Sequence, residues 1–302
     1  MLRKSLIIIL GPTGVGKTNL CLKICEHFKT PVISADSRQI YKEIPIGTAA
    51  PTAEEMSRIT HYLVGTHELT DYYSAALFEA QVTEILEKLF TQTDTATMCG
   101  GSMMYIDAIT KGIDDIPTIR PDIRRAIHEQ YIKEGLGPIL QELASADPTH
   151  YNIIDRKNYK RVLHAVEVCR QTGQPYSSFR TNKAKDRPYR IIKVGLIRDR
   201  EELNDRINKR VEEMLAAGFL EEARRVYPLR NYNSLNTVGY KELFAYFDGQ
   251  YDYDFAVEKI KRNTRVYARR QMTWFKRDTS ITWFHPDDEQ AVIRYIEQSL
   301  KN

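Results

Sequence analysis

The first apolar segment of the chain is continuous rather than alternating. Five consecutive apolar residues run from Leu6 to Leu10, which is typical of a strand covered on both of its faces. Apolar residues then recur at helical spacing from Leu20 to Phe28, and a second strand-like segment follows from Pro31 to Asp36. This order of strand, helix and strand predicts an α/β fold with a parallel sheet.

One more helix and one more strand extend this pattern. Apolar residues at helical spacing predict a helix over about Ser74 to Phe90, and a short strand follows over Ala96 to Cys99. Another helix is expected to begin after Ser102. These elements add to the same predicted α/β core.

The pattern changes at Gly112. Acidic residues and prolines interrupt it, two or three helices are expected to follow, and no strand signal returns until Tyr189. We therefore predict a helical lobe over residues 113–185. It is inserted into a core that residues 1–112 and 186–302 form together.

The chain rejoins the core after the lobe. Ile191 to Ile197 is predicted to be a strand of the first sheet, and Asp199 is placed to cap the helix that follows. That helix carries an apolar stripe from Leu203 to Leu215. The remainder of the chain is predicted to be mostly helical.

Composition narrows the class of protein. The 302 residues are 42% hydrophobic and 28% charged, which excludes a disordered or fibrous chain. No apolar run approaches the roughly 18 residues of a membrane span, and the early strand lacks the cleavage site of a secretory signal. Four scattered cysteines form neither a disulfide framework nor a C-x-x-C zinc site. We expect a soluble cytoplasmic protein with no membrane contact.

A phosphate-binding motif lies between the first strand and the first helix. It matches G-x-x-x-x-G-K-[ST] and predicts a core of the P-loop NTPase-like kind. Backbone N–H groups of the loop and the N-terminus of the helix attract phosphate, while Lys17 supplies an ammonium group and Thr18 a hydroxyl for Mg²⁺. The predicted diphosphate-binding residues are Gly11, Pro12, Thr13, Gly14, Val15, Gly16, Lys17 and Thr18.

The loop by itself accepts a diphosphate or a triphosphate such as ATP. The second carboxylate that ATPases and GTPases place after a buried strand is missing from the ends of Ala96–Cys99 and Val194–Ile197, which disfavours routine hydrolysis. The same loop can hold a diphosphate leaving group and stabilise the charge that develops on it. Asp36, at the carboxyl end of the second strand, can face this loop. An Asp at such a position is equally often a turn cap, so both roles remain open.

Several further segments follow in a distinctive order. They are Asp36-Ser-Arg-Gln-Ile-Tyr41, Ile46-Gly-Thr-Ala49, Gly100-Gly-Ser-Met-Met-Tyr105, Arg206-Ile-x-x-Arg210, Val238-Gly-Tyr-Lys-Glu242 and Arg269-Arg-Gln-Met-Thr-Trp-Phe275. Together with the phosphate loop, this order and spacing resembles the tRNA dimethylallyltransferase family, also called tRNA isopentenyltransferases, in its bacterial type. The resemblance covers nearly the whole chain.

The resemblance implies a reaction and its catalytic residues. A dimethylallyl group would move from dimethylallyl diphosphate to N6 of the adenosine immediately 3′ of the anticodon, with release of diphosphate. It implies Asp36 as the acceptor of the amine proton, and Thr13 and Arg210 beside the reacting diphosphate. The phosphate loop itself, through Thr18, predicts Mg²⁺ as cofactor. Arg210 lies at the border of the apolar stripe of its helix rather than on the polar face, which agrees with a site role.

Positive charge late in the chain points to RNA. Residues 259–277 include eight Lys or Arg and no acid, and in a helix Arg262, Arg265 and Arg269 share one face. Lys157, Lys160 and Arg161, and the stretch from Arg180 to Arg190, are expected to form a second basic surface. With the family resemblance, the predicted tRNA-binding residues are Asp36, Ser37, Arg38, Gln39, Ser102, Arg124, Lys160, Arg161, His164, Lys241, Arg262, Arg265 and Arg269.

Two other functions are compatible with the motifs. A P-loop kinase of a small metabolite would use Asp36 as base for a hydroxyl, and a nucleic-acid-binding ATPase would need no transferase chemistry. Leu77 and Gly65 stand where relatives often carry acids, and His164 stands near an expected Arg, which alters local contacts only. We expect a monomer that binds a tRNA anticodon stem-loop and dimethylallyl diphosphate, without zinc.

Overall fold

The computed structural model describes residues 4–181 and 183–301 of the chain. It divides into two compact units. Unit 1 consists of residues 1–110 and 186–302, and unit 2 of residues 111–185. Each unit has an apolar core of its own.

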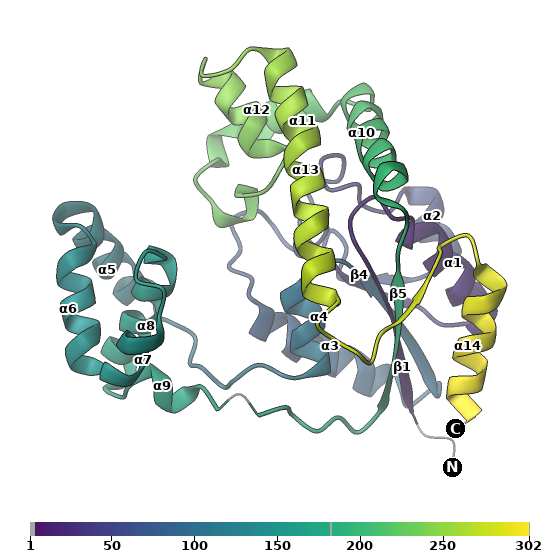
Figure 1. The fold of residues 1–302 in the computed structure, drawn as a ribbon, viewed down its shortest axis with the longest axis horizontal. Helices are drawn as coiled ribbons and strands as arrows, with labels where there is room; N and C mark the ends of the chain where they lie inside the picture. The colour runs from purple at the N-terminus through teal and green to yellow at the C-terminus, as the bar shows by residue number, and fades with distance from the viewer. Residues whose placement is uncertain (1–3, 182, 302) are drawn as a thin grey trace. The chain divides into compact units, whose positions relative to one another are not determined.

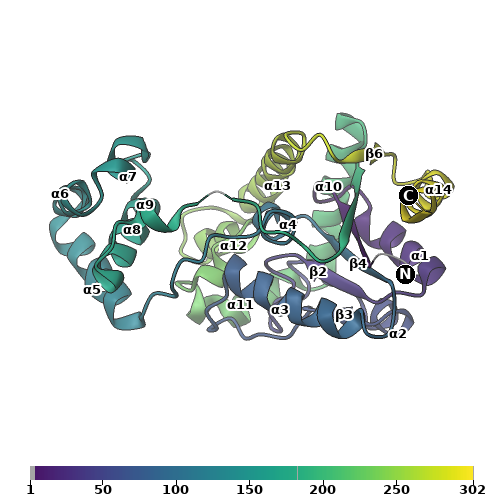
Figure 2. The ribbon, with the colours of Figure 1, turned by 90° about the horizontal axis from the view of Figure 1, so that it is seen from below.

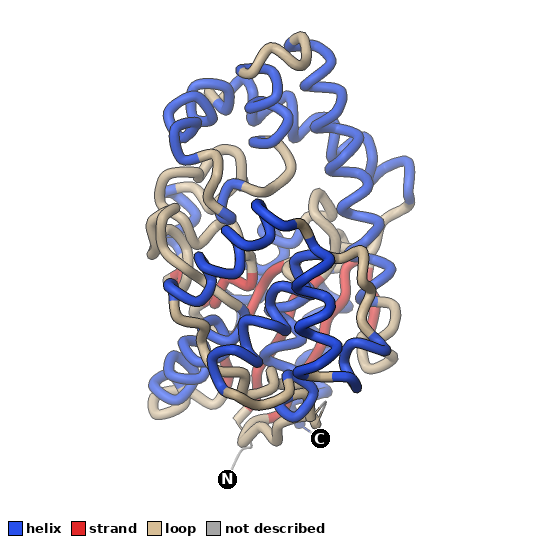
Figure 3. The backbone as a smooth tube through the Cα atoms, turned by 90° about the vertical axis from the view of Figure 1, so that its left-hand side faces the viewer, coloured by secondary structure: helices blue, strands red, loops and turns tan. Residues whose placement is uncertain are grey.

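Unit 1 is built on a parallel sheet (Figures 1 and 3). In the described part of the chain it has six strands in the order β3-β2-β4-β1-β5-β6, and every neighbouring pair is parallel. The strands are β1 (Ser5–Leu10), β2 (Val32–Ala35), β3 (His61–Tyr62), β4 (Thr95–Gly100), β5 (Arg190–Leu196) and β6 (Thr282–Phe284). The predicted fold class, a P-loop NTPase-like parallel sheet flanked by helices, is confirmed.

The central strand β1 is apolar throughout because helices cover both of its faces. Ile7 and Ile9 point to α1 (Lys17–Phe28) and α14 (Glu289–Lys301), while Leu6, Ile8 and Leu10 point to the opposite side. On that side lie α3 (Ala75–Leu89) and α4 (Met103–Thr110), with α13 (Tyr253–Phe275) beside them (Figure 2). The uninterrupted apolar pattern of the strand is therefore explained by burial on two faces.

The return to unit 1 after residue 185 follows the predicted order, with one difference in detail. Strand β5 pairs with β1, and α10 (Arg200–Ala216) begins immediately after Asp199. The Asp199 side chain, however, makes no capping hydrogen bond; only its backbone carbonyl joins the first turn. The remaining helices of unit 1 are α2 (Ala53–Arg58), α11 (Phe219–Val226) and α12 (Tyr240–Phe247), with short 3-10 turns at Tyr227–Leu229 and Asn233–Leu235.

Two short strands were not predicted. Strand β3 has two residues and β6 has three, so neither produces a recognisable alternation of apolar and polar positions. Both lie at the edges of the sheet. Their place depends on pairing with β2 and β5, which a local sequence pattern does not record.

Unit 2 contains more helices than the two or three that the sequence predicted. Its described residues form α5 (Pro121–Glu134), α6 (Leu136–Ala146), α7 (Pro148–Ile153), α8 (Tyr159–Thr172) and α9 (Tyr176–Phe179). Gly135, with φ 78°, separates α5 from α6, and Asp147 ends α6 and caps α7. The sequence pattern does not show these breaks, because apolar residues keep their helical spacing on both sides of each break. The separate helices therefore look like longer ones in the sequence. The core of the unit is formed by Ile127, Ile139, Leu143, Val162 and Val166.

The cysteines are free and mostly buried. Cys21 and Cys25 belong to an apolar cluster, Cys169 is also buried, and Cys99 is half-buried near the end of β4. Separately, no helix of the described residues has both the length and the apolar character needed to cross a membrane.

Candidate functional site

The phosphate loop connects β1 to α1 in a conformation that only glycine adopts easily. Gly14 has φ 82° and Gly16 has φ 106°, both in the left-handed region. A Cβ atom on Gly14 would lie 2.7 Å from Ile207 Cγ1 of α10, so any other residue there would also displace a packed side chain. The helix begins directly at Lys17, and its unpaired N–H groups therefore lie next to the loop.

Lys17 is held inside the loop. Its ammonium group donates hydrogen bonds to the carbonyl oxygens of Gly11 at 3.0 Å and Pro12 at 2.8 Å. Burial, together with the positive charge of Arg210, lowers the pKa of Lys17 to about 8, although Cys99 and Asp36 oppose the shift. A positive charge with little hydration is thus available to an anion in the loop.

Asp36 follows β2 and belongs to the same group of charges. One carboxylate oxygen, Oδ1, accepts hydrogen bonds from the backbone N–H groups of Arg38 at 2.9 Å and Gln39 at 3.3 Å. Among the described residues no donor contacts the second oxygen, Oδ2. The charge of Asp36 also raises the pKa values of Lys17 and Arg210, against the effect of burial. Asp36 is therefore a turn cap through one oxygen, while the other is available for chemistry.

Arg210 reaches the loop from α10. Its Nη1 donates to Thr13 Oγ1 at 3.3 Å, and its Nη2 lies 3.5 Å from the carbonyl oxygen of Thr48. Burial lowers the pKa of Arg210 from its usual value, and Asp36 opposes that shift. The predicted trio of Thr13, Asp36 and Arg210 therefore meets at the carboxyl edge of the sheet, next to Lys17.

The turn after Asp36 is supported from two sides. Ser37 donates its backbone N–H to Ser102 Oγ at 2.8 Å, which joins this turn to the segment after β4. Gln39 Nε2 donates to the carbonyl oxygens of Thr48 at 3.3 Å and Ala49 at 2.9 Å. Ser102 and Gln39, both predicted to bind tRNA, thus have structural partners within the chain as well.

Sequence reasoning missed Gln271. This side chain of α13 is 2% exposed, accepts from the backbone N–H of Thr13 at 2.9 Å and donates to the carbonyl oxygen of Gly101 at 2.8 Å. One turn earlier, Tyr267 is half-buried, and burial together with the charge of Asp36 raises the pKa of its phenol to about 12, while Arg38 opposes the rise. A polar amide among the apolar residues of the packed face of α13 was the signal in the sequence.

Glu222 was also missed. It is fully buried, and its carboxylate accepts from the backbone N–H groups of Ile46 at 2.8 Å and Gly47 at 2.7 Å and from the hydroxyl of Tyr240 at 2.6 Å. A buried carboxylate without a cation is stable only with such donors. It fixes the loop that presents the Thr48 carbonyl to Arg210 and Gln39.

The predicted tRNA-binding residues of unit 2 lie on α5 and α8. Lys160 and Arg161 are exposed, whereas Arg124 and His164 both approach the buried carboxylate of Glu167, at 3.7 Å and 3.3 Å. All four belong to one small helical unit. Two of them already have an acidic partner.

The predicted tRNA-binding residues of α12 and α13 differ in solvent exposure. Lys241, Arg262 and Arg269 are exposed, but Arg265 is half-buried and donates to Asn208 Oδ1 of α10. On the other face of α13, Ile260 and Phe275 are buried with Gln271. The positive face of this helix therefore depends mainly on Arg262 and Arg269.

The basic surface expected from Arg180 to Arg190 is contradicted at Arg187 and Arg190, whereas Arg180 and Lys183 are exposed. Lys185 pairs with Asp115 at 2.9 Å, and the nearly buried Arg187 pairs with Glu79 at 2.5 Å and donates to the carbonyl oxygens of Ala108 and Ile109. Arg190 donates to the Ser299 carbonyl. Residue 182 lies outside the described residues. These charges are used inside the fold, which charge counting along the sequence does not detect.

The fold and the site together define a P-loop α/β protein with a carboxylate and an arginine at its phosphate loop. Comparison of the chain with known proteins identifies its family. The family model described as IPP transferase matches residues 39–278. The chain is 64% identical to tRNA dimethylallyltransferase 2 of Parabacteroides distasonis over 98% of this chain and 99% of that protein. It is 57% identical to tRNA dimethylallyltransferase 1 of Bacteroides fragilis, with 100% of both chains covered. The chain belongs to the IPP transferase family.

The chain is also similar to solved structures of tRNA-modifying transferases. The full-length tRNA isopentenylpyrophosphate transferase of Bacillus halodurans is 31% identical, with a TM-score of 0.72, and 99% of this chain and 97% of that chain are covered. A eukaryotic dimethylallyltransferase solved while acting on tRNA has a TM-score of 0.81 at 23% identity, over 98% of this chain and 77% of that one. This last likeness concerns the fold alone.

Proposed function

We propose that this chain transfers a dimethylallyl group from dimethylallyl diphosphate to N6 of the adenosine 3′-adjacent to the anticodon of a tRNA. The products are N6-isopentenyladenosine and diphosphate. The observation that carries the proposal is the meeting of Lys17, Asp36 and Arg210 at one phosphate loop. Cations for a leaving diphosphate thus lie beside a carboxylate that can take a proton.

In this proposal the Asp36 carboxylate acts as the base that accepts the amine proton. The lone pair of the adenine amine is delocalised into the ring, so the nitrogen becomes a useful nucleophile only if its proton is accepted as the C–N bond forms. Asp36 Oδ2 takes that proton in our proposal, while Oδ1 stays bound to the turn and fixes the carboxylate. The allylic C–O bond breaks, and its electron pair leaves with the diphosphate.

In this proposal the cations Lys17 and Arg210 stabilise the negative charge of the departing diphosphate. Lys17 and the loop N–H groups hold the diphosphate, and Arg210 with the Thr13 hydroxyl faces the bond that breaks. Gln271 keeps the Thr13 peptide in place. Because Arg210 and Lys17 are poorly hydrated, their attraction for the leaving group is stronger than that of exposed residues.

A divalent cation fits this site only as a companion of the substrate. In the described residues no cluster of three His, Cys, Asp or Glu side chains is arranged to bind a metal. We propose that Mg²⁺ is held by the Thr18 hydroxyl and by substrate oxygens, and that when bound it neutralises charge on the diphosphate.

The RNA substrate explains the basic residues. We propose that Arg262 and Arg269 of α13, Lys241 of α12, and Lys160 and Arg161 of the helical unit contact phosphates of the anticodon stem-loop. The target adenosine has to leave its stack to reach Asp36. Residues 113–185 act as an RNA-binding lobe in this proposal. A tRNA substrate also implies work in the cytoplasm, and nothing in the mechanism requires more than one chain.

Mass spectrometry tests the proposal directly. An anticodon stem-loop is incubated with the protein, Mg²⁺ and dimethylallyl diphosphate, and the expected product carries one dimethylallyl group on the adenosine base. A stem-loop with guanosine at that position is the control. Absence of the adduct contradicts the proposal. The comparisons do not support the alternative of a small-metabolite kinase, for which ATP would compete with dimethylallyl diphosphate for the loop.

A further inference from the structure

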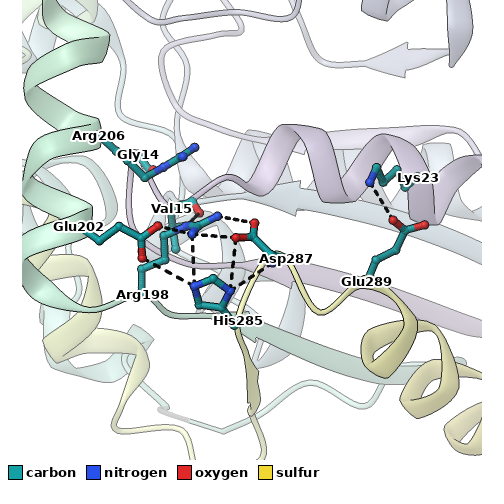
Figure 4. Close-up of polar contacts among 9 residues, drawn as sticks. All are labelled: Gly14, Val15, Lys23, Arg198, Glu202, Arg206, His285, Asp287 and Glu289. Atoms are coloured by element: carbon teal, nitrogen blue, oxygen red, sulfur yellow. Dashed lines mark hydrogen bonds and ion pairs between the residues drawn. The ribbon is translucent and has the colours of Figure 1, made fainter.

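Two arginines bind the phosphate loop from its outer side (Figure 4). Arg198, just after β5, donates its Nε–H to the carbonyl oxygen of Val15 at 2.9 Å. Arg206 of α10 donates its Nε–H to the carbonyl oxygen of Gly14 at 3.0 Å. Neither contact belongs to the group of charges around Asp36, and nothing in the sequence motif requires Arg198.

The contact of Arg198 orients a peptide group. A peptide bond is planar and trans, so its C=O and its N–H point in opposite directions. Fixing the Val15 carbonyl toward Arg198 therefore turns the N–H of Gly16 the other way, into the anion-binding side of the loop. A Cβ on Gly16 would lie 3.6 Å from Pro286 Cβ and 3.7 Å from Arg198 Nη2, so the outer side is packed as well as bonded.

The other end of Arg198 is held by two carboxylates and a histidine. Its Nη2 donates to Asp287 Oδ1 at 2.6 Å, and its Nη1 donates to Glu202 and lies 3.2 Å from His285 Nε2 and from Asp287 Oδ2. The side chain is only 4% exposed. Glu202 and Asp287 offset its positive charge, so Arg198 contributes to anion binding through orientation more than through net charge.

We propose that Arg198 is a positioning residue for the diphosphate, which sets the Val15–Gly16 peptide in its binding orientation and is itself held by Glu202, His285 and Asp287. The segment between β6 and α14 thereby becomes part of the substrate site without touching the substrate. The inference depends on the proposed function only for the identity of the anion. Orientation of the loop applies to any diphosphate.

Calorimetric titration of the whole protein with inorganic pyrophosphate and Mg²⁺ tests this role. Arg198→Met keeps the bulk of the side chain and removes every donor, and we expect pyrophosphate affinity to fall roughly tenfold, the effect of losing one well-oriented hydrogen bond to a charged ligand. The KM for dimethylallyl diphosphate should rise by the same factor, while tRNA affinity stays within about twofold. Arg198→Lys retains one donor but not the fork, and should be intermediate.

Two further variants distinguish the orienting role of Arg198 from a general effect of weakening the segment between β6 and α14. Asp287→Asn leaves the loop contact intact and weakens the hold on Arg198, and we expect a smaller loss of pyrophosphate affinity, about threefold. Glu289→Gln is the matched control. It breaks the neighbouring ion pair of Glu289 with Lys23 at 2.7 Å, which joins the same segment to α1 without contacting the loop (Figure 4), and should leave the affinity unchanged.

The outcomes are distinct. Unchanged pyrophosphate affinity in Arg198→Met, or an equal loss for pyrophosphate and tRNA, overturns the positioning role. If Arg198→Met does not fold, Arg198→Lys and Asp287→Asn decide, and wild-type affinity in both overturns it. A wild-type protein that binds pyrophosphate but transfers no dimethylallyl group contradicts the proposed function instead, and leaves the role of Arg198 standing.

Discussion

At the scale of single residues, the site depends on side chains whose environment changes their chemistry. Lys17 and Arg210 are cations that burial makes less favourable, and Asp36 is the anion that compensates both. A site of this kind is primed for a ligand that brings negative charge.

Asp36→Asn should lower the turnover number roughly 10²- to 10⁴-fold, because the amide cannot accept the proton of the adenine amine. Binding of the stem-loop should remain near wild type, since the amide oxygen can still cap the turn through the Arg38 and Gln39 N–H groups. Single-turnover kinetics and a filter-binding assay measure the two quantities separately. A variant as active as wild type would remove Asp36 from the role of base.

Lys17 predicts a pH dependence of anion binding. Its pKa is lowered to about 8 in the free protein, so the ammonium form that binds diphosphate is lost as pH rises through about 8. Pyrophosphate affinity should therefore decrease between pH 7 and pH 9, in titrations at constant ionic strength. Lys17→Met is the control: it should bind weakly, with a flatter profile over this range. A wild-type profile that stays flat to pH 9 would contradict the assignment.

Gln271→Met should destabilise the protein by about 1–3 kcal/mol, because it leaves the Thr13 N–H and the Gly101 carbonyl without their buried partner. The KM for dimethylallyl diphosphate should also rise, since Thr13 belongs to the loop. Urea unfolding and steady-state kinetics report the two effects. Gln290→Met, at an exposed position of α14, is the matched control and should change neither quantity.

At the scale of elements, α13 combines two functions on its two faces. One face carries Ile260, Gln271 and Phe275 into the core of unit 1, and the other exposes Arg262 and Arg269. The sequence predicted Arg262 and Arg269 on one face of this helix, and both are exposed. It did not predict that Arg265 would be partly buried against Asn208, because a cation at the border of a helix face can turn to either side.

Arg269→Glu should weaken stem-loop binding and reduce the slope of log affinity against log salt by about one or more, because a phosphate contact and its released counterion are lost. Arg294→Glu makes the same charge change at an exposed position of α14 and serves as control. Fluorescence anisotropy over a series of salt concentrations measures the slope. Equal behaviour of the two variants would move the RNA surface away from α13.

In the molecule as a whole, the helical unit is inserted between two segments of unit 1 rather than added at one end of it. Unit 2 has a separate core, and its two connecting segments are adjacent where the Lys185 N–H donates to the Lys111 carbonyl at 2.8 Å. Unit 1 adds β5 and then β6 to its sheet after the interruption. Such an arrangement predicts that the phosphate site does not require the inserted residues.

Replacing residues 112–184 by a short Gly/Ser linker should leave pyrophosphate affinity within about threefold of wild type, because Lys111 and Lys185 are already close. Stem-loop affinity should fall at least about tenfold, since Arg124, Lys160, Arg161 and His164 are removed with the unit. Calorimetry and filter binding measure the two. Loss of the pyrophosphate site would show that the phosphate site depends on the inserted residues.

Features that are local in the chain could be predicted from the amino-acid sequence. The parallel sheet, the phosphate loop and the amphipathic helices follow from apolar periodicity and from eight contiguous residues, because each is set by neighbours along the backbone. The catalytic role of Asp36 and the contacts with tRNA stay predictions. They depend on ligands rather than on the fold.

Contacts between residues that lie far apart in the sequence could be identified only in the folded chain. Gln271 contacts Thr13 across 258 positions of sequence, and Arg198 contacts Val15 across 183, and no local pattern marks either pair. The same holds for Arg187, whose charge counted toward a basic surface but is neutralised by Glu79. Composition and spacing record which groups are available, whereas desolvation and pairing in the folded chain decide which of them act.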